Sequence, residues 1–62
     1  MREVFVIRGI VNGGFWSNSY VDFRGFLFAT KYYSIDSEDI LKDLLLALNK
    51  CPCEIIKVFI KV

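Results

Sequence analysis

The sequence predicts a two-layer α+β domain in which a three-stranded, mainly antiparallel sheet carries one helix on one face. Three segments rich in Val, Ile, Phe and Tyr are typical of strands: 2–11, 20–33 and 54–62. The segment between the last two, 34–50, has apolar residues at helical spacing. The order is therefore β-β-α-β, and 62 residues leave room for a single domain, 1–62.

A turn and a loop separate the first two predicted strands. Asn12, Gly13 and Gly14 readily adopt the positive φ angles that hairpin turns need. The loop is expected to run to Ser19, and an antiparallel hairpin is the simplest topology. Gly25, in the middle of the second strand, indicates a bulge or a close backbone approach.

The helix has a start signal and a stop signal. Asp36 or Ser37 is expected to cap its N-terminus, and Pro52 prevents its continuation. Its apolar stripe is predicted to consist of Ile40, Leu41, Leu44, Leu45 and Leu48. This stripe is expected to cover one face of the sheet.

Alternation along each strand assigns the two faces. The helix side is predicted to carry Val21, Phe23, Leu27, Ala29, Ile56, Val58, Ile60 and Val62. The far side then carries seven large apolar side chains, namely Val4, Val6, Ile10, Phe26, Phe28, Ile55 and Phe59. They lie among the charged residues Arg8, Asp22, Arg24, Lys57 and Lys61.

This far face is more apolar than the surface of a soluble monomer usually is. One helix covers only one face, so the other is expected to meet a second copy in a homodimer or higher oligomer. In the alternative, the loop with Phe15 and Trp16 folds over the open face and the chain stays monomeric.

Composition sets further limits. An apolar content of 55% argues against disorder, and ordering a chain of this size costs on the order of 90 kcal/mol. Because small domains often meet that cost by oligomerising, the high content of apolar residues supports the expected dimer. The net charge of +1 gives no strong field toward nucleic acid. Without an apolar run near 18 residues or a secretory signal, the chain is expected to be cytoplasmic and to span no membrane.

Few residues suit catalysis, so no enzyme and no cofactor are expected. The chain has no His, the usual general base at neutral pH. Cys51 and Cys53 are too few for a closed zinc site, which needs four ligands, although a site shared within a dimer stays open. The simpler interpretation is two thiols in a turn.

Phe15 and Trp16 stand out because large aromatics are unusual in a loop of Asn, Gly and Ser. Either they pack on their own fold, or across a dimer, as a lid, or they anchor a partner, since Trp and Tyr are enriched at interface hot spots. The hypothetical partner-binding surface consists of Phe15, Trp16, Tyr20, Arg24, Phe26, Phe28 and Phe59.

Two kinds of partner suit this surface. The first is another protein, which is our leading hypothesis for the function. The alternative is single-stranded nucleic acid, with bases stacked on Tyr20, Phe26, Phe28 and Phe59 while nearby cations hold the phosphates.

Four motifs, Gly14–Trp16, Phe23–Thr30, Ser37–Asp39 and Ile55–Val58, give a pattern that resembles very small bacteriophage and prophage accessory proteins. The recurring elements are a Gly-aromatic turn, an F-x-G-x-x-F-A-T strand, an acidic helix start and a closing I-I-x-V strand. The resemblance implies a viral protein that binds a host component in the bacterial cytoplasm. It implies no functional residue, because such proteins mostly have no assigned activity.

Overall fold

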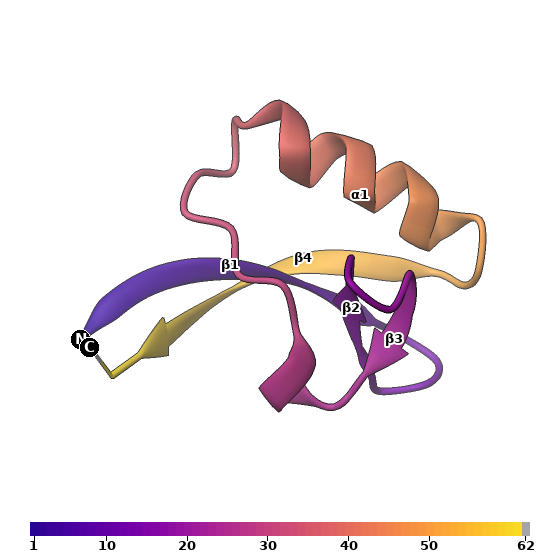
Figure 1. Ribbon diagram of the computed structural model, residues 1–62, viewed down its shortest axis with the longest axis horizontal. Coiled ribbons are helices and arrows are strands. Elements are labelled where there is room, and N and C mark those ends of the chain that lie inside the picture. Colours follow the sequence, from indigo (N-terminus) through magenta and orange to yellow (C-terminus); the bar gives the residue numbers. More distant parts are fainter. Residues whose placement is uncertain (62) are drawn as a thin grey trace.

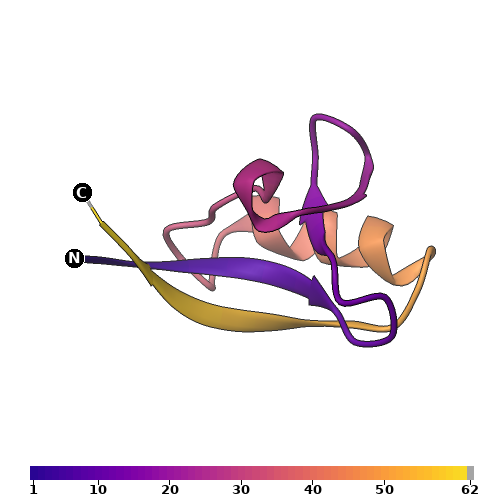
Figure 2. The ribbon, with the colours of Figure 1, turned by 90° about the horizontal axis from the view of Figure 1, so that it is seen from below.

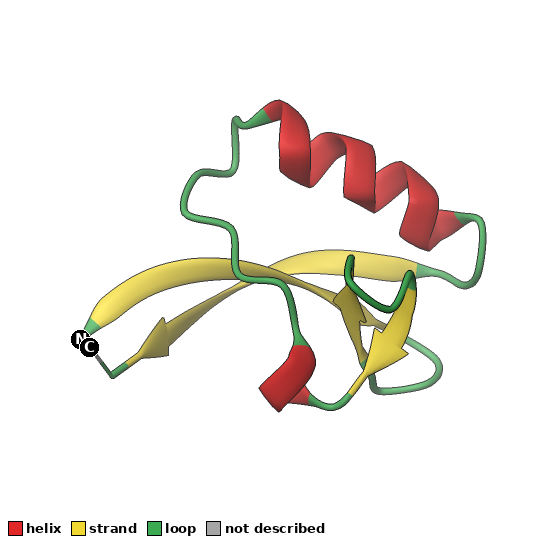
Figure 3. Ribbon diagram, viewed as in Figure 1, coloured by secondary structure: helices red, strands yellow, loops and turns green. Residues whose placement is uncertain are grey.

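The computed structural model describes residues 1–61, and its elements form a small α+β domain. The strands are β1 (Arg2–Gly9), β2 (Phe15–Ser17), β3 (Asp22–Arg24) and β4 (Cys53–Ile60). The helices are a 3₁₀ turn, η1 (Phe26–Phe28), and α1 (Glu38–Leu48). All strand pairs are antiparallel, in the order β3-β2-β1-β4. The α+β class with a single α-helix is confirmed, whereas the expected three strands are four (Figures 1 and 3).

The β1–β4 pair is the longest strand pair of the sheet. Eight residue pairs run from Arg2 opposite Ile60 to Gly9 opposite Cys53. The N–H of Ile10 continues the ladder by donating to the carbonyl of Pro52 over 3.0 Å. Strands from the two ends of the sequence therefore lie side by side, and α1 lies above them in Figure 1.

The predicted second strand, 20–33, is wrong for most of its length, and the predicted loop before it contains β2. Within 20–33 only Asp22–Arg24 forms a strand, which pairs with β2. Beyond Gly25 the chain enters η1, where Phe28 donates to the carbonyl of Gly25 over 3.0 Å. The physical reason is that β2 offers only three residues for pairing, so a longer strand has no partner there.

After η1 the chain returns to the edge of β1. Tyr32 and Phe5 exchange two backbone hydrogen bonds, of 2.7 and 2.8 Å. Gly25 itself is extended and precedes η1, so it forms no bulge within a strand. This excursion places η1 on the side of the sheet away from α1 in Figure 1.

The helix is shorter than predicted, and one of the two expected caps is confirmed. The Ser37 side chain accepts a hydrogen bond from the N–H of Ile40 over 3.3 Å. Of the predicted stripe, Ile40 is buried and Leu44 packs against the core, whereas Leu41, Leu45 and Leu48 are exposed. Ala47, which the stripe omitted, is fully buried. The helix thus contacts the sheet along a narrow line, Ile40–Leu44–Ala47.

The predicted faces of β4 are reversed. Cys53 and Ile55 pack against the core cluster beneath α1, and Ile55 pairs with the buried Ile7. Because opposite residues share a face, Ile56, Val58 and Ile60 lie on the far side, and Val62 falls outside the described residues. Apolar residues occupy both the odd and the even positions of β4, so alternation alone could not show which set faces the helix. The pairing of Gly9 with Cys53 in the β1–β4 ladder determines it.

The predicted apolar far face does not form as expected. Val4 and Val6 are on that face, as predicted, but they are fully buried. Ile55 and Phe59 lie on the helix side instead, and Phe26 and Phe28 are in η1. Val21 and Leu27, which were assigned to the helix side, are exposed. The homodimer argued from that face therefore loses its stated basis.

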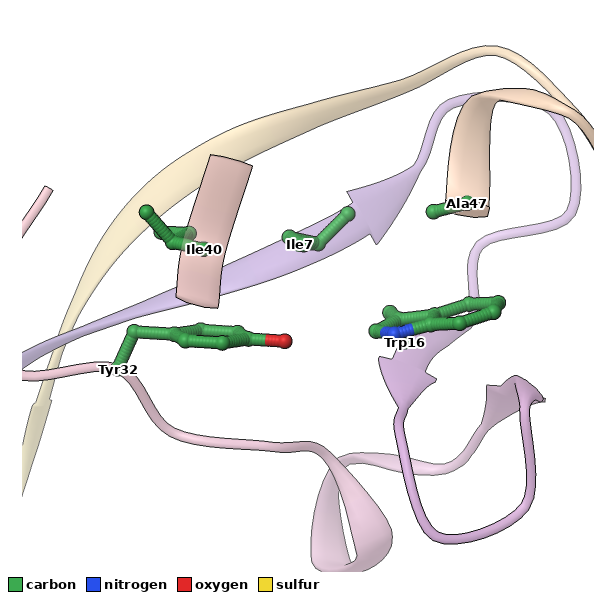
Figure 4. Packing of buried hydrophobic residues seen from close by; sticks show 5 residues of the cluster. All are labelled: Ile7, Trp16, Tyr32, Ile40 and Ala47. Atoms are coloured by element: carbon green, nitrogen blue, oxygen red, sulfur yellow. The ribbon is translucent and has the colours of Figure 1, made fainter. Parts of the chain in front are cut away.

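The core sits between α1 and the sheet, and five buried residues define it: Ile7, Trp16, Tyr32, Ile40 and Ala47. Figure 4 shows Ile7, Ile40 and Ala47 in a row facing the rings of Tyr32 and Trp16. These five residues come from four segments of the chain, so the core forms only when β1, β2, the return segment and α1 assemble.

Candidate functional site

The structure brings together five of the seven residues predicted to bind a partner and separates the other two. Phe15 of β2, Tyr20 of the following turn, Arg24 of β3 and the two phenylalanines of η1 form one surface. With three neighbours, the exposed Val21 and Leu27 and the half-buried Lys31, they are called the aromatic tip: Phe15, Tyr20, Val21, Arg24, Phe26, Leu27, Phe28 and Lys31. Figure 2 shows the β2–β3 loop and η1 together beside the sheet.

Trp16 lies in the core and is unavailable to a partner. It is 1% exposed, and its ring meets that of Phe23 edge-to-face at 5.5 Å. Its indole Nε1 is buried without a hydrogen-bond acceptor among the described residues. Of the two roles considered for Phe15 and Trp16, packing on their own fold is the one that Trp16 takes.

Phe59 is exposed but lies away from the tip. It is opposite Glu3 near the end of β4, on the same side of the sheet as Ile7 and Ile55. In Figure 1 this end of the β1–β4 pair extends beyond α1. The predicted surface is therefore two surfaces, because the reversed faces of β4 moved Phe59 to the helix side.

Two edge-to-face ring pairs build the tip. The Phe15 and Phe26 rings are 5.1 Å apart at an interplanar angle of 83°, and those of Tyr20 and Phe28 are 5.6 Å apart at 82°. Such pairs contribute about 0.5–1.5 kcal/mol beyond the burial of area. The rings of η1 are thus held by β2 and by the turn, although they remain largely in contact with solvent.

Two cations lie over ring faces in the tip. The Arg24 guanidinium is 4.4 Å from the centre of the Tyr20 ring, and the Lys31 ammonium is 4.9 Å from that of Phe26. Lys31 also donates to the carbonyl of Phe26 over 3.2 Å. These contacts hold the positive charges beside apolar surface.

Hydrogen bonds fix the base of the tip. The N–H of Asn18 donates to Thr30 Oγ1 over 2.9 Å, and the N–H of Thr30 donates to the carbonyl of Trp16 over 3.0 Å. Asp22 Oδ1 accepts from the N–H of Phe23 over 2.8 Å. The tip is thereby anchored to the strand that carries the buried Trp16.

Val21 is the strained residue of the tip, with a φ of +51°. A β-branched residue rarely adopts this left-handed conformation, which costs roughly 1–3 kcal/mol. Its side chain is exposed, so no burial of Val21 offsets that cost. The turn at Val21 was not predicted, because the strand expected over 20–33 runs through this position.

The most perturbed ionisable group lies in the core. Burial, together with a hydrogen bond that the hydroxyl donates to the carboxylate of Asp43, raises the pKa of Tyr32 well above its ordinary value. The Tyr32–Asp43 bond joins the return segment to α1. Its evident role is to satisfy a buried hydroxyl and to place the helix.

The two cysteines are free thiols, each partly buried. Burial, and then the neighbouring Cys51, raises the pKa of the Cys53 thiol, which lowers its thiolate fraction. Asn12 Nδ2 donates to Cys51 Sγ over 3.3 Å, linking the first turn to the last. Among residues 1–61 no cluster of three potential metal ligands occurs and no pocket opens.

Comparisons with protein-family models, curated proteins and solved structures found no match to this chain. The interpretation of the tip thus rests on its own chemistry, and the resemblance to phage proteins remains a prediction. In the part of the chain that the structure describes, no helix has the length and apolar character needed to cross a bilayer.

Proposed function

We propose that this chain is a non-enzymatic binding protein that contacts a partner protein through the aromatic tip. The carrying observation is that Tyr20, Val21, Phe26, Leu27 and Phe28, all within nine residues, are between 41% and 83% exposed. Contiguous apolar surface of this kind marks interaction sites in soluble proteins. About half or more of the surface of four of these five side chains is thus left in contact with solvent.

The pairing of the rings favours a protein partner. Rings held edge-to-face by Phe15 and Tyr20 are pre-organised, so little side-chain freedom is lost on binding. Tyr and Arg are also enriched at interface hot spots. With Arg24 and Lys31 beside the rings, the fitting partner surface is an apolar groove with an acidic rim.

Strain at Val21 supports the same proposal. Strained backbone conformations cluster at functional sites. Here the strained residue presents an exposed apolar side chain between Tyr20 and the start of β3.

Single-stranded nucleic acid is the second candidate, favoured by two cations among aromatic rings. A protein partner fits better, because Arg24 and Lys31 cover ring faces of Tyr20 and Phe26 on which bases would stack. The predicted platform on one face of the sheet also does not form, since Phe26 and Phe28 are in η1 and Phe59 lies on the helix side of β4. The resemblance to phage accessory proteins favours a bacterial host protein in the cytoplasm as the partner.

The test is photo-crosslinking capture from bacterial lysate with the native chain and two double variants. Leu27→Ser with Phe28→Ser removes the exposed apolar side chains of η1. Ile35→Ser with Leu46→Ser is the matched control, since both residues are exposed and lie outside the tip. We expect the tip variant alone to lose a specific protein. Equal capture by all three chains refutes the proposal, as does loss of the captured material after nuclease treatment.

A matching measurement addresses nucleic acid directly. Titration of the native chain into a fluorescent oligothymidylate at low salt is expected to give no saturable binding. Tight binding that weakens steeply with added salt would favour the second candidate instead.

A further inference from the structure

The outer edge of β4 is the long unpaired edge of the sheet. β4 hydrogen-bonds to β1 and, among the described residues, to no strand on its other side. It runs for eight residues, whereas β3, at the opposite edge, runs for three. A long edge strand presents unpaired N–H and C=O groups that pair readily with another strand.

The exposed leucines of α1 form a flank that faces this edge. Leu41, Leu45 and Leu48 recur at helical spacing and are 47–67% exposed. At 100° per residue they lie on one side of the line that packs on the sheet, and Asp43 lies on the other. Asp43 bonds to Tyr32, which pairs with β1 on the side away from β4. The leucine flank is therefore on the β4 side.

Helix and edge together make an apolar step. In Figure 2, β4 runs along the border of the sheet as its outermost strand, a ledge beside β1. Phe59, 61% exposed, lies on the helix side of this ledge, beyond the part where Ile55 packs on the core. The β4 step is defined as the outer edge of β4 with Leu41, Leu45, Leu48 and Phe59.

We propose that a second copy of this chain occupies the β4 step, with the two β4 strands paired antiparallel about a two-fold axis. The two four-stranded sheets then become continuous. The antiparallel arrangement brings the Phe59 end of each strand beside the start of the other. Above that start stands the C-terminal end of the other helix, because Ala47 and Cys53 share the core. Each copy thus supplies apolar cover that the other lacks.

The charges of β4 favour this orientation. Lys57 lies near the middle of the strand, on the helix side with Ile55. Antiparallel pairing about an axis at Ile56 sets Lys57 opposite Ile55 of the other strand, whereas an in-register parallel pair would set Lys57 against Lys57. Lys57 is also within 3.7 Å of Glu3 in its own copy, which reduces its repulsion.

The size of the step suits a reversible dimer. An eight-residue strand is about 27 Å long, and with the leucine flank above it the contact removes on the order of 500 Å² per copy. The total is near the roughly 1,000 Å² that separates specific interfaces from incidental contacts. We therefore expect association at micromolar rather than nanomolar concentrations.

The first test is the molar mass in solution over a concentration series, by light scattering. We expect the native chain to dimerise and Leu45→Glu to weaken dimerisation by at least about tenfold. Leu27→Glu, an equivalent change in the aromatic tip, is the control and should dimerise normally. A native chain that stays monomeric into the millimolar range overturns the proposal, and so does a Leu45→Glu variant that dimerises like the native chain. Leu41→Glu replaces Leu45→Glu if the latter does not fold by circular dichroism.

The second test identifies the edge itself. In a monomer only alternate amides of an edge strand are protected from hydrogen exchange, because the others point away from β1. We expect an unbroken run of slow amides through 54–59 at high concentration, which becomes alternate in Leu45→Glu. An alternate pattern in a native dimer would place the interface elsewhere. Neither test depends on the aromatic tip, so the two proposals stand or fall separately.

Discussion

Two neighbouring residues, Phe15 and Trp16, belong to two regions that contain the same chemistry and use it differently. In the core, Trp16 and Phe23 meet edge-to-face at 5.5 Å, and Ile7, Ile40 and Ala47 complete the packing. In the tip, Tyr20 and Phe28 meet edge-to-face at 5.6 Å and remain half exposed. The difference is the second layer of the fold: α1 covers the Trp16–Phe23 pair and leaves the Tyr20–Phe28 pair exposed to solvent. Ring pairs therefore indicate local order, and a covering layer decides whether they stabilise the fold.

The largest effect is expected from Trp16→Ala. Removing a buried Trp costs about 3–5 kcal/mol, and a chain of this size has roughly 3–9 kcal/mol of stability in total. We expect the variant to be largely unfolded at 37 °C, as measured by urea denaturation followed by circular dichroism. A well-folded Trp16→Ala would show that the core described here is not the stabilising one.

Trp16→Phe is the control for that experiment. It keeps an aromatic ring in the core and removes the buried Nε1 that has no acceptor. Because the unpaired donor carries its own desolvation cost, the loss is expected to be about 1–2 kcal/mol. A loss as large as that of Trp16→Ala would instead mean that Nε1 makes a bond, for example to an ordered water.

A smaller effect is expected from Tyr32→Phe. It should lower the free energy of unfolding by about 1 kcal/mol near neutral pH, because a buried hydrogen bond to Asp43 is lost. The pH dependence is more specific. Since the pKa of Tyr32 is raised in the folded chain, the unfolded chain ionises first, and stability falls as pH rises above the ordinary value of 10.0. Denaturation at pH 8 and pH 11 should show a steeper loss in the native chain than in Tyr32→Phe. Equal losses would contradict the burial of this hydroxyl.

The core could be predicted from the sequence only in part. Capping by Ser37 and the inward position of Ile40 follow from local rules and were confirmed. The faces of β4 were not predictable, because Ile55 and Ile56 are equally apolar and only the long-range pairing with β1 distinguishes them. Local chemistry thus specified the elements, and contacts between distant segments specified which side each presents.

The tip was predicted as a set of residues but not as a structure. Tyr20, Phe26 and Phe28 were expected on one surface, yet through alternation in a long strand of which only Asp22–Arg24 forms. They meet because η1 and the turn fold back on β2. Apolar composition favoured a strand over 20–33, and the shortage of pairing partners along β2 prevented it.

An effect of opposite sign is expected from Val21→Asn. Asn tolerates the left-handed region far better than Val, so the free energy of unfolding of the variant should rise by about 0.5–1 kcal/mol. In a domain of this size that raises Tm by several degrees, measurable by calorimetry. The tip would then be the region where stability was given up for presentation of a side chain. An unchanged or lower Tm would show that Val21 is not strained in solution.

The smallest effect on stability, and the sharpest contrast with the core, is expected from Leu27→Ser. This side chain is 83% exposed, so its removal should change the free energy of unfolding by less than about 0.5 kcal/mol. In the same urea experiment, Trp16→Ala, eleven positions earlier, should lose several times more free energy of unfolding than Leu27→Ser. If Leu27→Ser also loses the captured partner, an apolar side chain with no role in folding carries binding. If it destabilises the fold as a core change does, the tip is packed in solution, and its surface belongs to the core and not to a partner.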